Sequence, residues 1–188
     1  MTPTVDPIAV AADVSATFER LGIPHTIGGS IAASFAGEPR STLDIDIVAA
    51  MDEAQVPALL SALSNDFYID EQAVRRAVRS RGSTNLIHQA SQLKVDLFIA
   101  GGTPLDQQQL HRRLRVDLGE GRVLYIHTPE DILLQKLHWY RKGGEVSDRQ
   151  WRDILGIVRT QEGRLDLRYL EVSANTLGVE DLLDRALK

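Results

Sequence analysis

The chain of 188 residues contains no cysteine. This absence excludes disulfide bonds and zinc sites built from thiolates. Histidine, the other common zinc ligand, does not occur in the HExxH spacing of zinc metalloproteases. The histidines are His25, His88, His111, His127 and His138. We therefore expect neither a structural nor a catalytic zinc ion.

Long apolar runs are also lacking. No segment approaches the roughly 20 apolar residues that a membrane-spanning helix requires. The first residues, Met1-Thr2-Pro3-Thr4-Val5-Asp6, lack the basic stretch of a secretory signal peptide. With 43% hydrophobic and 25% charged residues, the composition is that of an ordinary globular protein. The sequence predicts a cytoplasmic protein without membrane contact.

The chain has no excess of basic residues. Lysine and arginine total 21 against 26 aspartates and glutamates, so the formal net charge is -5. This balance argues against a surface for long duplex DNA. Two segments are nevertheless locally basic, residues 75–81 and 111–115, and leave RNA open as a partner. The simpler interpretation is that both segments are solvated faces, because charge runs are weak signals.

Two aspartates lie on one apolar segment that is rich in β-branched residues. The segment 42–50 reads as a strand, and its period of two places Asp44 and Asp46 on the same face. Two like charges at this spacing repel each other unless a cation or a shared proton lies between them. Oxygen ligands without Cys or His favour Mg²⁺ or Mn²⁺. Alone, the Asp-x-Asp pattern also fits a nucleotide-sugar glycosyltransferase.

A glycine-rich turn precedes these acids, and a third acid follows them. Gly28-Gly29-Ser30 opens a short predicted helix whose free amides can bind an anion. The two glycines can equally form only a tight turn. Asp96 lies in the strand-like segment 94–100 and is either a third member of the acidic group or a solvent-facing strand residue.

Together, Gly29-Ser30, Asp44-Ile45-Asp46 and Asp96 resemble the pattern of the polymerase-beta-type nucleotidyltransferase superfamily. The similarity is greatest to the branch that holds the AbiEii/MenT-type toxins and the lincosamide and aminoglycoside nucleotidyltransferases. The resemblance implies that the three acids bind Mg²⁺ or Mn²⁺ and act in catalysis. It also implies that an NTP such as ATP is held by the residues around the turn: Gly28, Gly29, Ser30 and Arg40. For Arg40 the sequence leaves two roles open, phosphate contact or fixing of the loop.

Lys136 lies on a predicted helix that starts at Thr128-Pro129. A capping threonine, a proline at the first helical position and acids in the first turn favour this start. On a helical wheel Lys136 falls on the apolar side. In the resembled family a lysine in the matching helix contacts nucleotide phosphates. The alternative is an aliphatic stem that packs while the amine reaches water.

Asp153 lies on the following helix, at about the level of Lys136 if the two helices are antiparallel. We expect these two residues to form an ion pair that orients Lys136. The resemblance implies that Asp153 also belongs to the active site, because an Arg-x-Asp helix matches in AbiEii/MenT-type enzymes. A surface-exposed acid is the alternative.

The predicted fold is α/β (α+β), with a mixed-sheet nucleotidyltransferase core over residues 1–127 and a C-terminal helical bundle over residues 128–188. Expected helices span 7–21, 31–35, 53–63, 128–141, 147–160, 167–177 and 179–187. Expected strands span 25–27, 42–50, 67–69, 85–87, 94–100, 114–118 and 122–126.

The predicted function is transfer of a nucleoside monophosphate from an NTP, with release of pyrophosphate. The acceptor stays open among the end of an RNA, a small molecule and a protein side chain. The resemblance to toxins adds a toxin–antitoxin role with an antitoxin or other partner chain. The alternative is a non-catalytic binding or antitoxin-like module that keeps the fold, because fold alone does not establish activity.

Overall fold

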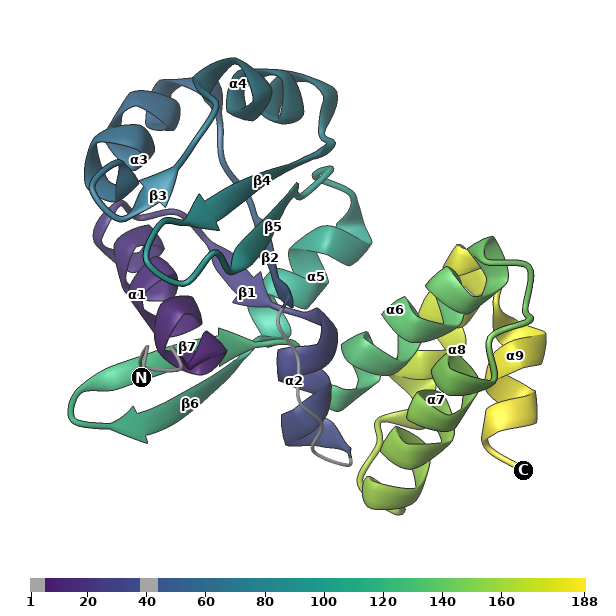
Figure 1. The fold of residues 1–188 in the computed structure, drawn as a ribbon. Coiled ribbons are helices and arrows are strands. Elements are labelled where there is room, and N and C mark those ends of the chain that lie inside the picture. Colours follow the sequence, from purple (N-terminus) through teal and green to yellow (C-terminus); the bar gives the residue numbers. More distant parts are fainter. Residues whose placement is uncertain (1–5, 38–43) are drawn as a thin grey trace. The chain divides into compact units, whose positions relative to one another are not determined.

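The structure of the chain is a computed structural model that describes residues 6–37 and 44–188 (Figure 1). Arg40 therefore lies outside the described residues. The described chain divides into two compact units. Unit 1 comprises residues 6–31 and 44–126, and unit 2 comprises residues 32–37 and 127–188. The division falls inside a short helix, so the chain passes between the units more than once.

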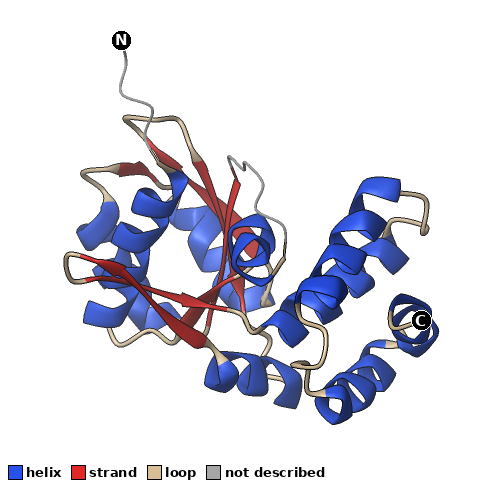
Figure 2. Cartoon of the chain, turned by 90° about the horizontal axis from the view of Figure 1, so that it is seen from below, coloured by secondary structure: helices blue, strands red, loops and turns tan. Residues whose placement is uncertain are grey.

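Unit 1 is built on a mixed sheet, as predicted (Figure 2). Over the described residues its strand order is β3-β4-β5-β2-β1-β7-β6. The pairs β2–β5 and β1–β7 are parallel and the other neighbours are antiparallel. The strands are β1 (His25–Ile27), β2 (Asp44–Ala49), β3 (Phe67–Tyr68), β4 (Ser83–His88), β5 (Lys94–Ile99), β6 (Leu114–Gly119) and β7 (Arg122–Ile126).

The sheet has one strongly apolar side. Along β2 and β5 every second side chain is buried, and these include Ile45, Ile47, Val95 and Leu97. Helices α1 (Pro7–Arg20), α3 (Val56–Leu63) and α4 (Glu71–Ser80) contact one another or the strands of this sheet. Because the apolar set is fixed by the period of two, the alternate positions, which carry the aspartates, are left for the other face.

Unit 1 contains two helices that the sequence analysis did not predict. Asp70 caps α4, whose buried residues are Val74, Ala77 and Val78. Thr103 and Asp106 form a capping box at the start of α5 (Pro104–Arg112), which buries no residue. The cap signals were present in the sequence, but α4 reads as a charge run and α5 as a polar segment without an apolar stripe.

Unit 2 is helical in its described residues. It contains the end of α2 (Gly29–Ala36) and the helices α6 (Pro129–Lys142), α7 (Asp148–Thr160), α8 (Leu167–Leu177) and α9 (Glu180–Ala186). α6 packs on α7 and α8, and α9 packs on α7 and α8. The predicted bounds of these helices agree with the observed ones within two residues. None of the described helices has the length and apolar character needed to cross a bilayer.

Candidate active site

Three acids lie on one face of two neighbouring strands in unit 1. β2 and β5 run parallel in a register that places Asp46 opposite Asp96 and Asp44 opposite Lys94. Neighbouring strands are about 4.8 Å apart, and positions i and i+2 point to the same face. Asp44 is exposed, whereas Asp46 and Asp96 are half-buried. The predicted convergence of the three acids is therefore present in the backbone register.

Gly29 brings the backbone of the glycine turn directly against Asp46. A Cβ built on Gly29 would lie 1.7 Å from Asp46 Oδ2, and the Gly29 φ is +54°. The amide of Gly28 also donates to the carbonyl of Asp46 over 2.9 Å. Both the close approach and the left-handed backbone require glycine at position 29. The turn thus confines the Asp46 carboxylate beside the start of α2, where Ser30 is half-buried.

Lys94 is a member of this group that the sequence analysis did not single out. Its Nζ lies 2.8 Å from Asp96 Oδ2. The hydrogen bond to Asp96 and the charge of that carboxylate raise the pKa of Lys94, and Asp44 and Asp46 add to the effect. Lys94 and Asp96 are two residues apart on β5, so the period of two places this lysine on the same face as the acids.

Asn85 completes the row of polar side chains. It lies on β4 directly opposite Asp96 and is exposed. Residues paired across a sheet point to the same face, so Asn85, Asp96 and Asp46 follow one another across three strands. A strand was predicted over residues 85–87, but no local pattern indicates this alignment, because the register of β4 on β5 is set by tertiary pairing.

The donor set suits a hard divalent cation. Carboxylate oxygens on facing positions are the ligands that Mg²⁺ and Mn²⁺ prefer. In the side-chain arrangement described here, no three His, Asp or Glu side chains of residues 6–37 and 44–188 are grouped so as to hold a metal ion. Asp96 instead faces Lys94. The residues fit a cation by chemistry and register, and Lys94 Nζ lies 2.8 Å from one of the two carboxylate oxygens of Asp96.

The predicted pair of Lys136 and Asp153 is present within unit 2. Lys136 Nζ on α6 donates to Asp153 Oδ2 on α7 over 3.0 Å. The Lys136 side chain is 16% exposed and that of Asp153 is 24% exposed. The lysine therefore lies with the apolar side of α6, as the wheel predicted, and its charge has a partner on the neighbouring helix.

The acids at the start of α6 are structural. Asp131 is fully buried and accepts hydrogen bonds from the hydroxyls of Thr128 and Tyr169, at 2.8 and 2.5 Å. Glu130 accepts a hydrogen bond from the amide of Asp166 over 2.9 Å. These bonds fasten the N-terminus of α6 to α8. They fix the position of α6 and hence of Lys136 in unit 2.

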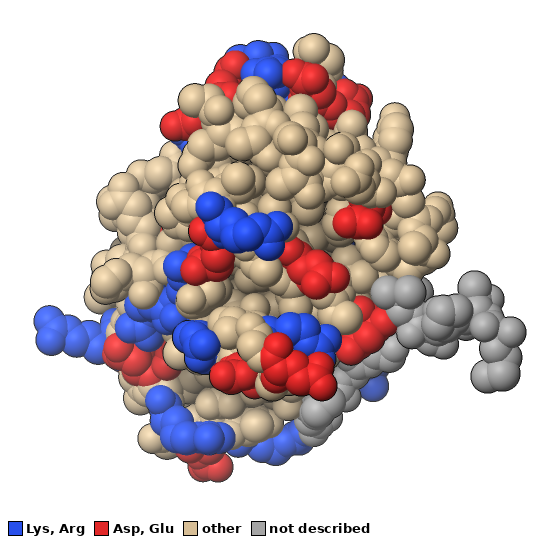
Figure 3. All heavy atoms as spheres, turned by 90° about the vertical axis from the view of Figure 1, so that its left-hand side faces the viewer, with Lys and Arg blue, Asp and Glu red and all other residues tan. Residues whose placement is uncertain are grey.

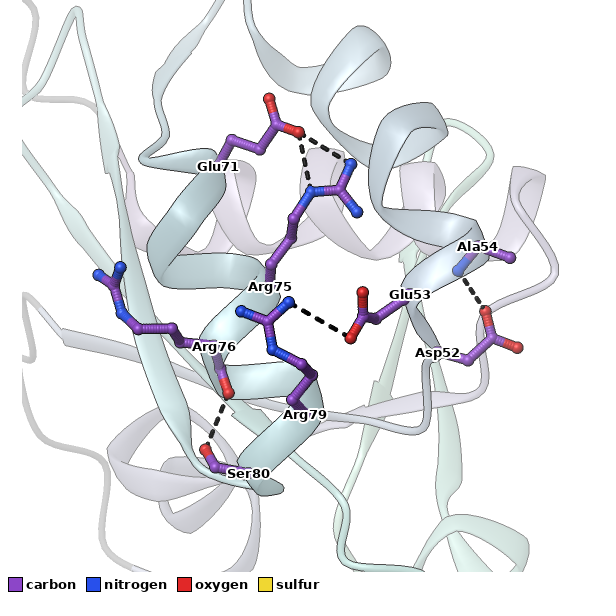
Figure 4. Close-up of polar contacts among 8 residues, drawn as sticks. All are labelled: Asp52, Glu53, Ala54, Glu71, Arg75, Arg76, Arg79 and Ser80. Carbon is purple, nitrogen blue, oxygen red and sulfur yellow. Dashed lines mark hydrogen bonds and ion pairs between the residues drawn. The ribbon is translucent and has the colours of Figure 1, made fainter.

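The basic segment 75–81 has local partners (Figure 4). Arg75 lies 2.8 Å from Glu71, and Arg79 lies 3.5 Å from Glu53. Arg81 donates to the carbonyl oxygens of residues 51 and 100, which follow the carboxyl ends of β2 and β5. Asp46 and Asp96 lie about 10 Å back along these strands. The segment is thus attached at the end of the sheet away from the acids.

The second basic segment also has its own partners. Arg113 donates to the carbonyl of His25 over 2.6 Å and lies 3.5 Å from Glu19. Arg115 lies 3.8 Å from Asp117 on β6, which is three strands, about 14 Å, from β2. On the face seen in Figure 3, blue and red side chains are interspersed. These arginines are directed to partners other than the three acids.

No protein-family model matches the sequence, and no curated protein matches it. Solved structures do match. An antigenic nucleotidyltransferase-like protein from Paracoccidioides brasiliensis shares 19% identity and a TM-score of 0.56, covering 95% of this chain and 90% of that one. The antibiotic-resistance factor ANT(2'')-Ia shares 16% identity and a TM-score of 0.54, covering 96% and 97%.

The lincosamide antibiotic adenylyltransferase LnuA, solved with lincomycin bound, shares 12% identity and a TM-score of 0.52, covering 82% of this chain and 97% of that one. At such identities the likeness shows the fold. The chain has the predicted nucleotidyltransferase fold, and assignment to the AbiEii/MenT-type branch stays a prediction.

Proposed function

We propose that this chain is a metal-dependent nucleotidyltransferase that moves a nucleoside monophosphate from an NTP to a hydroxyl of a small molecule. The observation that carries the proposal is the register of β2 on β5. It places Asp46 opposite Asp96, with Asp44 on the same face. The likeness of the fold to nucleotidyltransferases supports the same reaction class.

Asp44, Asp46 and Asp96 would hold Mg²⁺ or Mn²⁺. When bound, the cation neutralises charge on the phosphates and on the departing pyrophosphate. Asp96 also takes the proton of the acceptor hydroxyl, whose oxygen forms a bond to the α-phosphorus. The bond from that phosphorus to the bridging oxygen breaks, and pyrophosphate leaves with the electron pair.

Backbone and lysine groups would bind the triphosphate. Gly28 and Gly29 let the chain approach closely, and the free amides at Ser30 donate to phosphate oxygens. Lys136, oriented by Asp153, supplies a positive charge for the phosphates. These roles follow the resemblance, and the Lys136–Asp153 hydrogen bond supports the orienting role of Asp153.

Two observations favour a small molecule as acceptor. Arg75, Arg79, Arg81 and Arg113 of the two basic segments are engaged by partners other than the acids. An RNA strand needs basic groups beside the acids to hold its phosphates. ANT(2'')-Ia is described as an antibiotic-resistance factor and LnuA as a lincosamide antibiotic adenylyltransferase. RNA and a protein side chain are the other acceptors that the assay distinguishes.

The experiment supplies each NTP with an α-³²P label, Mg²⁺ or Mn²⁺, and one acceptor class at a time. The classes are aminoglycosides and lincosamides, bulk RNA, and the protein itself. We expect label transfer and pyrophosphate release with a small-molecule pool, and neither in EDTA. Asp44→Asn/Asp46→Asn is the control. Transfer of label to RNA alone would overturn the small-molecule acceptor. Transfer that persists in EDTA or in the Asp44→Asn/Asp46→Asn variant would overturn the metal-dependent mechanism.

A further inference from the structure

Lys94 sits inside the acidic group and not at its border. It lies opposite Asp44 on the neighbouring strand and two residues before Asp96 on its own strand. Its ammonium approaches Asp96 Oδ2 to 2.8 Å. The same ammonium is attracted by Asp44 and Asp46. The Lys94 ammonium thus pairs with Asp96 and lies in the field of the other two carboxylates proposed to hold the metal.

A divalent cation and this ammonium compete for the same oxygen. A carboxylate oxygen ligates Mg²⁺ at about 2.0–2.1 Å, and an ammonium at hydrogen-bond distance from that oxygen occupies the approach. The two positive charges also repel each other across a few ångströms. Asp96 therefore must release Lys94 as it turns toward the cation.

Lys94 is free to leave. Its side chain is 42% exposed, on a flexible four-carbon stem, whereas Asp96 is 24% exposed. An exposed lysine can rotate into water at small cost. The Lys94–Asp96 pair therefore orders Asp96 and is able to open.

We propose that Lys94 is the internal counter-ion of this acidic site: it holds Asp96 in the metal-free protein, is displaced by the entering cation, and so weakens binding of free metal. This inference rests on the proposed function, because it takes Asp44, Asp46 and Asp96 as the metal ligands. Lys94 is a positioning residue in this role. Its effect is on the cation and on Asp96, and not on the acceptor.

The test is calorimetric titration of Mn²⁺ into the metal-free full chain and into Lys94→Met, which keeps most of the apolar stem. Removing the competing charge should tighten Mn²⁺ binding about tenfold. Lys94→Arg keeps the charge and should bind like the parent. Lys142→Met is the matched control, because Lys142 belongs to unit 2 and its ammonium lies over the ring of Trp139, at 5.0 Å.

Thermal unfolding gives a readout independent of activity. Without metal, Lys94→Met should unfold at a temperature equal to or below that of the parent, because Asp96 loses its partner. With saturating Mn²⁺ the variant should gain more stability than the parent, in proportion to its tighter binding. An equal gain in both proteins would contradict competition.

The outcomes separate the two proposals. Equal Mn²⁺ affinity in the parent and Lys94→Met, with loss of binding in Asp44→Asn/Asp46→Asn, would overturn the role of Lys94 and leave the metal site standing. Absence of saturable Mn²⁺ binding in the parent and Lys94→Met, with and without a non-hydrolysable NTP analogue, would overturn the metal site and the role of Lys94 together.

Discussion

The two units each contain a lysine–aspartate pair, and the pairs differ in their surroundings. Lys94 and Asp96 lie on one strand beside two further carboxylates, and the lysine is 42% exposed. Lys136 and Asp153 join two helices, and the lysine is only 16% exposed. The first pair lies beside two further carboxylates, where a metal cation can replace Lys94 as the positive partner. The second pair satisfies a charge that packing has removed from water, so it should matter more to stability.

The largest effect should come from the acids of unit 1. Asp44→Asn/Asp46→Asn removes two of the three proposed ligands, and a metal site is worth several kcal/mol in the transition state. We expect nucleotidyl transfer to fall by at least about a hundredfold. The measurement is pyrophosphate release at saturating NTP. Circular dichroism confirms folding of the variant, and a folded variant with parental rates would contradict the site.

Gly29→Ala should disturb the same site through the backbone. A new Cβ would meet the Asp46 carboxylate, and φ near +54° is unfavourable for alanine. We expect transfer to fall by about ten- to a hundredfold and stability by about 1–2 kcal/mol. Gly102→Ala, where φ is +80° with open space around it, is the matched control. It should show the stability loss without the loss of transfer.

Lys136→Met separates charge from packing in unit 2. The substitution keeps most of the stem and removes the ammonium, so the helix should persist. If Lys136 contacts the phosphates, binding of a non-hydrolysable NTP analogue should weaken about tenfold. Fluorescence titration measures it. Affinity equal to that of the parent would refute phosphate contact and leave Lys136 a structural residue.

Removing the aspartate of each pair tests the comparison directly. Asp153→Asn leaves the partly buried Lys136 without its ionic partner and should cost about 1–3 kcal/mol in the free energy of unfolding. Asp96→Asn should cost about 1 kcal/mol or less, because its pair is more exposed and the change relieves repulsion with Asp46. Urea unfolding without metal measures both. A larger loss for Asp96→Asn would reverse the comparison.

The smallest effect concerns the buried His127. Burial lowers the pKa of His127, while Asp131 opposes the shift, and no hydrogen-bond partner of its ring lies in the described part of the chain. Below a pH of about 6.5 the unfolded chain takes up a proton that the folded chain does not. The free energy of unfolding therefore decreases as the pH is lowered. We expect His127 to reduce the free energy of unfolding by about 1 kcal/mol between pH 7 and pH 5.5.

His127→Leu should flatten part of this pH dependence. Some dependence should remain, because burial also lowers the pKa of His25. Urea unfolding at a series of pH values measures the slopes. A slope unchanged by His127→Leu would show that His127 does not set it.

Much of the fold followed from local patterns. The strand 122–126 and the helix 167–177 have the predicted bounds, because alternation, caps and glycine stops act within a few residues. The helices α4 and α5 were missed because the pattern that identifies a helix is an apolar stripe. In α4 the buried apolar residues alternate with arginines, and α5 buries no residue.

The candidate site was predicted only in part, because local patterns identify some of its residues and not others. The period of two identified Asp44 and Asp46, and the strand-like segment 94–100 supplied Asp96 as the third acid. The same period would have identified Lys94, two residues before Asp96, had charge of either sign been followed along that strand. Asn85 had no such signal, because nothing in its own segment states which residue of β5 it opposes.

Which residues share a face could be read from the sequence alone, because side-chain direction along a strand or helix depends only on local backbone geometry. The sequence thus predicted the pairing of Asp44 with Asp46 and the apolar placement of Lys136. The folded chain adds three features: Asp96 lies opposite Asp46, Lys94 contacts Asp96, and Arg81 and Arg113 donate to backbone carbonyls. Strand register and long-range ion pairs join segments distant in the chain, and local preferences do not encode them.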